Sequence, residues 1–145
     1  MLENAYSYFF SFAFFILLKN SISDFRTKFI DERPHQFLLG FIVAIYVFSH
    51  LFKQLIIYSF IASFLASIIS RYLALAKGDT NALNILLLGY MLFPFKFVTF
   101  ICFLIIAHAC LMLLVLLKVL PPEKYPFYPF ILASHLINGI FWWTA

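Results

Sequence analysis

The chain has 145 residues, of which 65% are hydrophobic, 21% are aromatic and only 11% are charged. Soluble domains contain roughly 45–50% apolar and about 25% charged residues, so this composition excludes a soluble enzyme, an extended linker and a disordered tail. The net charge of +4 is spread over the breaks between apolar segments, which is typical of membrane topology and not of nucleic-acid binding. We therefore expect an integral membrane protein with no nucleic-acid partner.

Six apolar segments, separated by charged or proline-bearing breaks, predict an all-α fold of six transmembrane helices. In chain order they cover residues 6–18 (continuing helically to about Thr27), 37–49 (extended by Leu51 and Phe52), 55–70, 79–93 (ended by Pro94), 97–117 and 127–143. Several are shorter than a usual span, so we expect local thinning of the bilayer around them. The first segment lacks the features of a cleaved signal and is expected to be retained. Without a repeat or a Gly/Ser linker, residues 1–145 are expected to form a single membrane-embedded core.

The basic residues predict the orientation of these helices. If the N-terminus lies outside, eight basic residues fall in loops on the cytoplasmic side and only two on the other side. The eight are Lys19, Arg26, Lys28, Arg33, Arg71, Lys77, Lys118 and Lys124, and the two are Lys53 and Lys96. This asymmetry satisfies the positive-inside rule. With six spans, both termini are expected outside a cytoplasmic membrane.

Two acidic residues stand out among the six in the chain. Asp24 and Asp79 each lie at a junction between a loop and an apolar helix, on the first and the fourth segment, and both fall at the cytoplasmic end. Ionisable groups near hydrocarbon are functional candidates. Two structural alternatives stay open: Asp79 could cap the fourth helix, and Asp24 could pair with Arg26 or Lys28.

Packing the first and fourth helices side by side would bring the two carboxylates together. Like charges a few ångströms apart cannot both ionise easily, so the pair shares a proton. The ionised partner can then take a proton from water while the protonated partner polarises a peptide carbonyl. This is aspartic peptide hydrolysis, which needs neither a metal nor a covalent intermediate, so no cofactor is expected. The four histidines are scattered without a metal-ligand spacing, and no metal site is predicted.

Three ordered motifs resemble the type IV prepilin peptidases and the related preflagellin peptidases, which are membrane aspartic proteases of the Gly-x-Gly-Asp type. The stretch 24–32 is similar to the family segment of Asp, five variable residues, Ile, Pro and a final Asp or Asn. The stretch 76–79 stands where the family has Gly-x-Gly-Asp, and 126–130 is similar to its Pro-Phe-Gly-Pro-Phe segment. The departures from these motifs are Ala76, Asn81, Asp31, Glu32 and Tyr128.

The resemblance implies that Asp24 and Asp79 are the catalytic pair. It also implies that Gly78 allows the scissile peptide to approach closely and that Lys77 contacts the substrate or lipid headgroups. The implied activity is removal of a short basic leader from prepilins or pseudopilins on the cytoplasmic side of their hydrophobic helix. A zinc-binding methyltransferase domain, which longer members carry, is not expected here.

Two other functions remain open on the residues alone. The first is a small ion- or proton-coupled transporter that uses Asp24 and Asp79 for protons or ions. The second is a non-catalytic membrane subunit, including one that binds prepilin-like helices without cutting them. The partners that the resemblance and the composition imply are a prepilin or pseudopilin substrate helix and membrane lipids.

Overall fold

A computed structural model describes residues 2–27, 32–73, 75, 77–117, 119 and 128–144. The described residues form six helices and no strand, so the expected all-helical fold is confirmed. The helices are α1 (Leu2–Thr27), α2 (Arg33–Phe48), α3 (Phe52–Leu73), α4 (Lys77–Tyr90), α5 (Pro94–Leu116) and α6 (Tyr128–Thr144). Several residues of the motifs lie outside the described part of the chain, namely 28–31, Ala76 and Pro126 together with Phe127.

Most helices begin several residues before the apolar segments from which they were predicted. Proline fits the first turn of a helix because its missing N–H would have no partner there. Helix α2 accordingly begins at Arg33 and Pro34, and α5 begins at Pro94. Helix α4 ends at Tyr90, three residues before the predicted end, because the chain turns there before Pro94. Hydropathy thus locates each helix but misses the first turn of most of them.

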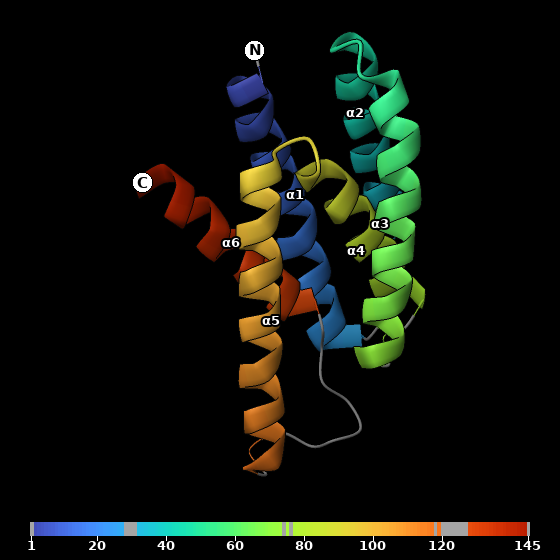
Figure 1. The fold of residues 1–145 in the computed structure, drawn as a ribbon. Coiled ribbons are helices and arrows are strands. Elements are labelled where there is room, and N and C mark those ends of the chain that lie inside the picture. Colours follow the sequence, from blue (N-terminus) through green and yellow to red (C-terminus); the bar gives the residue numbers. More distant parts are fainter. Residues whose placement is uncertain are drawn as a thin grey trace.

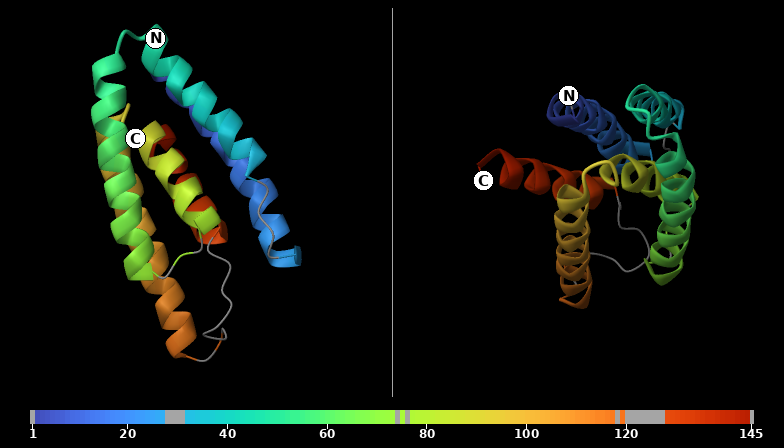
Figure 2. Two further views of the ribbon diagram at one scale, coloured as in Figure 1. Left: turned by 90° about the vertical axis from the view of Figure 1, so that its right-hand side faces the viewer. Right: turned by 45° about the horizontal axis from the view of Figure 1, so that its top comes forward.

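Successive helices run in alternating directions, except that α4 and α6 lie obliquely within the bundle (Figure 1). Helix α4 packs against α2, α3 and α5, while α1 packs against α2 and α6. Helices α3 and α5 stand at the outside of the bundle (Figure 2). Their outward faces carry large exposed apolar side chains, including Phe60, Phe64, Ile105 and Leu116. Exposed faces of this kind suit contact with lipid chains and not with water.

Three helices are long and apolar enough to cross a membrane. They are residues Asn4–Asp24 of α1, all of α3 and all of α5. Helices α2, α4 and α6 have 16, 14 and 17 residues, which is below the roughly 20 residues that cross a typical hydrocarbon core. The structure therefore supports membrane-spanning character for three helices of the six that the sequence predicts.

Small residues allow the helices to approach closely. Ala62 and Ala66 of α3 are fully buried on a bundle-facing stripe, and α3 packs closely on α4. At Gly89 of α4, a Cβ atom would collide with the ring of Phe9 from α1. Small residues at such crossings are the usual means of tight packing between membrane helices.

A buried histidine joins α6 to α1 and α4. The His135 ring stacks on Phe10 at a centroid distance of 4.3 Å. Its Nε2 lies 3.0 Å from the Phe10 carbonyl oxygen and its Nδ1 lies 2.7 Å from the Tyr90 hydroxyl. Because a carbonyl only accepts, Nε2 carries the proton and the Tyr90 hydroxyl donates to Nδ1. These two bonds satisfy both ring nitrogens of His135 within the core.

Candidate active site

Asp79 lies in the first turn of α4 and is buried, with only 8% of its surface exposed. The first turn of a helix presents unpaired N–H groups and a positive dipole end, which stabilise a nearby carboxylate. Lys77 and Gly78 precede Asp79 as the first residues of the same helix. The position therefore tolerates a buried acid that an apolar helix interior would exclude.

Asp24 lies one turn before the end of α1 and is half-buried. Asn20 precedes it by four residues, so both side chains occupy the same face of the helix. Asn20 is fully buried. This face of α1 thus turns two polar groups towards the inside of the bundle.

A hydrogen-bonded cluster connects α1, α2 and α6 at this end of the molecule. The Tyr128 hydroxyl lies 3.2 Å from Nε2 of His35. The Asn20 amide nitrogen lies 3.4 Å from Nδ1 of the same ring. All three side chains are buried. When Asn20 donates to Nδ1, the neutral imidazole carries its proton on Nε2 and donates it to the Tyr128 oxygen, which leaves the Tyr128 proton for another acceptor.

The two predicted acids lie within electrostatic range of this cluster. The carboxylates of Asp79, Asp24 and Glu32 all interact electrostatically with the Tyr128 hydroxyl. We expected α1 and α4 to bring the acids together by packing side by side. Instead, these two helices meet at Phe9 and Gly89, towards the other end of the bundle. At the acid end, residues of α2 and α6 connect them.

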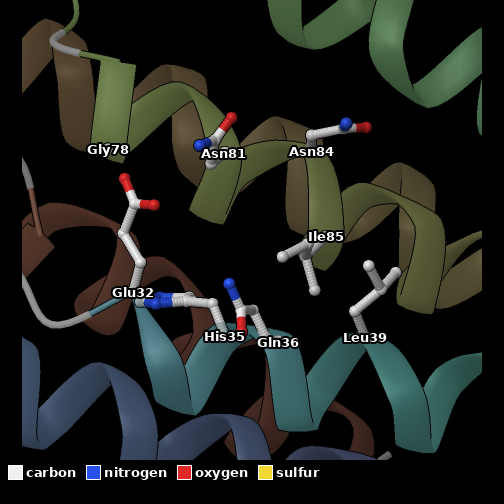
Figure 3. A pocket seen from close by; sticks show the side chains of 8 residues that line it. All are labelled: Glu32, His35, Gln36, Leu39, Gly78, Asn81, Asn84 and Ile85. Carbon is white, nitrogen blue, oxygen red and sulfur yellow. The ribbon is translucent and has the colours of Figure 1, made fainter.

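A pocket of about 240 Å³ opens near Asp79, between α2 and α4. Each helix contributes four residues: Glu32, His35, Gln36 and Leu39 from α2 or its N-cap, and Gly78, Asn81, Asn84 and Ile85 from α4. Figure 3 shows the two sets facing each other across the pocket. Since Gly78 directly precedes Asp79, a ligand in the pocket would lie next to a buried carboxylate.

The structure distinguishes the two residues predicted to bind substrate. Gly78 lines the pocket, whereas Lys77 is exposed and is not part of its wall. The roles of Asp24, Asp79, Gly78 and Lys77 stay predictions, since their positions alone do not test them.

Sequence reasoning set aside several residues that this site contains. The sequence predicts no role for His35, which is one of four scattered histidines, and Glu32 stands out only as a departure from the first motif. The spacing of Glu32, His35, Gln36 and Leu39 places them on one face of a helix, and Gly78, Asn81 and Ile85 follow the same rule. This shared periodicity of polar residues was a signal available in the sequence.

The described residues contain no group of three or more His, Cys, Asp or Glu side chains that could hold a metal ion. Comparison of the chain with protein-family models, with curated proteins and with solved structures finds no match. The proposal for function therefore depends on the residues of the site and on the motifs in the sequence.

Removing the Tyr128 hydroxyl tests whether the cluster stabilises the protein, and this test needs no activity assay. Tyr128→Phe keeps the ring but removes the bond to His35, leaving a buried imidazole nitrogen without this partner. We expect a loss of about 1–3 kcal/mol in stability, measured by thermal unfolding in detergent micelles. Tyr8→Phe is the matched control because Tyr8 is exposed. Equal melting temperatures for the two variants would contradict a stabilising role of the cluster.

Proposed function

We propose that this protein is a membrane aspartic endopeptidase that removes a short basic leader from prepilin-like proteins at the cytoplasmic face of the membrane. The observation that carries the proposal is the buried carboxylate of Asp79 next to an open pocket, with Asp24 at the same end of the bundle. The three motifs in chain order support the same reaction. A peptide in the pocket would lie next to Asp79, because Gly78 lines the pocket wall.

In the proposed reaction, the ionised carboxylate accepts a proton from water, and the water oxygen attacks the scissile carbonyl carbon. The protonated carboxylate donates to the carbonyl oxygen at the same time. Collapse of the tetrahedral intermediate breaks the C–N bond. The leaving nitrogen takes up a proton from one carboxyl group, and the other carboxylate takes the proton of a gem-diol hydroxyl, so that the pair again holds one proton.

The proposed topology has six spans with both termini outside. Helices α2, α4 and α6 would cross as short spans in a locally thinned bilayer. Residues Arg33, Arg71 and Lys77 lie at helix ends on the same side as the acids, while Lys53 and Lys96 begin helices on the other side. This distribution supports a cytoplasmic position for the acid end.

Co-expression with a panel of prepilin-type substrates tests this proposal. We expect the wild-type protein to shorten at least one substrate by the length of its leader, seen as a size shift on a gel. The empty vector is the control. Failure to shorten any substrate of the panel, with both proteins present in the membrane, would contradict the proposed activity.

A proton-coupled transporter is the second candidate, and one observation favours it. His135 is a fully buried ionisable residue within α6, hydrogen-bonded to Tyr90, and ionisable residues inside membrane helices often mark proton pathways. Reconstituted vesicles distinguish the two functions. A pH change across the vesicle membrane that depends on Asp79, without any peptide cleavage, would favour transport over hydrolysis.

A further inference from the structure

The pocket between α2 and α4 has two ends of different chemistry. Helices α2 and α4 both begin at the acid end of the bundle. Each lines the pocket with residues from about two helical turns (Figure 3). Glu32 and Leu39 are seven residues apart, as are Gly78 and Ile85. Seven residues of helix rise by roughly 10 Å, which is the length of about three residues of extended chain.

One end of the pocket is acidic. Glu32 is exposed and stands at the N-cap position of α2, yet its side chain makes no capping hydrogen bond. Figure 3 shows its carboxylate directed across the pocket towards Gly78. Because the Glu32 carboxylate does not cap its own helix, it can pair with a positively charged group of a ligand.

The opposite end of the pocket is apolar. Leu39 and Ile85 lie across from each other there (Figure 3). Two branched aliphatic side chains favour an aliphatic or aromatic side chain of the ligand. The pocket thus changes from charged to apolar along its length.

Side-chain amides line the middle of the pocket. Gln36 and Asn81 make no side-chain hydrogen bond to any described residue. The Asn84 amide nitrogen donates to the Ser63 hydroxyl of α3 over 3.3 Å, which orients the Asn84 amide and leaves its oxygen as an acceptor. An amide offers both a donor and an acceptor, so it matches the N–H and C=O groups of an extended main chain.

We infer that this pocket holds the substrate in one direction, with a basic residue at Glu32 and the first apolar residues at Leu39 and Ile85. The inference rests on the proposed function and adds the part of the substrate that is recognised. The main chain between these anchors pairs with the amides of Gln36 and Asn81. Because Asp79 follows Gly78, the bond to be cut lies at the Glu32 end of the pocket.

A charge exchange tests the acidic end. Two substrates are used that differ only in one residue beside the cut, Lys in the first and Glu in the second. We expect the wild-type protein to cleave the Lys substrate about tenfold faster and Glu32→Lys to reverse this preference. The isosteric Glu32→Gln should remove most of the preference. It keeps the test available if Glu32→Lys does not fold. Glu123→Lys, the same change of charge in an acid outside the three motifs, should keep the wild-type preference.

A preference for Lys that persists unchanged in Glu32→Lys and Glu32→Gln would overturn the inference while leaving the proposed peptidase intact.

A binding experiment covers the case in which the wild-type protein cuts nothing. The probe is a synthetic peptide of two lysines followed by an apolar helix, with a diazirine-bearing leucine at the start of that helix. It is cross-linked to the Asp79→Asn protein in vesicles.

We expect cross-links at Leu39 or Ile85, identified by mass spectrometry, and fewer of them when Glu32→Lys is added. This result without cleavage by the wild-type protein would support the pocket and contradict the peptidase. Cross-links scattered over the outer faces of α3 and α5, without any at Leu39 or Ile85, would overturn the inference.

Discussion

Asp79→Asn and Asp24→Asn should each abolish leader cleavage. Asparagine has nearly the same shape as aspartate but cannot carry the proton that the reaction moves. General acid–base groups contribute about 10²–10⁴-fold to rate, and the two carboxylates act as a unit, so loss of either should lower cleavage by at least about 100-fold. The measurement is the fraction of substrate shortened in membranes that contain equal amounts of each variant.

Glu123→Gln is the control for this experiment, because Glu123 is an acid that belongs to none of the three motifs. It should cleave at the wild-type rate. If cleavage persists in both aspartate variants, the aspartic mechanism is wrong even though the protein cuts. If only one variant loses activity, Asp24 and Asp79 do not work as a pair.

Gly89→Ala should destabilise the protein, whereas Gly40→Ala should not. A Cβ atom at Gly89 would meet the ring of Phe9 and lie 3.1 Å from the Cδ1 of Ile42. Both neighbours are fully buried, so neither can move away freely. Overpacking of this kind costs typically about 1–3 kcal/mol. At Gly40, nothing lies within 4 Å of an added Cβ, and alanine there should gain up to about 1 kcal/mol in helix propensity.

The measurement is the melting temperature of the two variants, determined by thermal unfolding in the same detergent. Gly89→Ala should also reduce cleavage, because α4 carries Asp79 and a shift of α4 against α1 moves that carboxylate relative to Asp24. A melting temperature of Gly89→Ala equal to that of Gly40→Ala would contradict the close crossing of α1 and α4.

The sequence is sufficient to predict the helices because apolar segments and prolines are local features. Each of the six predicted segments corresponds to one observed helix, and differences occur where polar residues such as Arg33 form the first turn. The span count differs for a physical reason. Helix α4 has only 14 residues, and eight of them are buried, so most of its apolar side chains pack inside the protein and are not available to contact lipid.

The candidate site can be predicted only in part from the sequence. Asp24 and Asp79 are identified by motif and by their position at helix ends. The cluster of His35 and Tyr128 near these acids depends on how α2 and α6 pack, and a hydropathy pattern contains no information on which helices are neighbours. Tyr128 was visible as a departure from the Gly of the family segment, but its bond to His35, 93 residues earlier in the chain, was not.

The most direct test of the central claim uses the purified protein in lipid vesicles together with one purified prepilin-type substrate. The products are identified by intact mass. The account predicts a single cut between the basic leader and the apolar helix by the wild-type protein, and an uncut substrate with Asp79→Asn in the same vesicles. An intact substrate with the wild-type protein, or the same cut with Asp79→Asn, would contradict it.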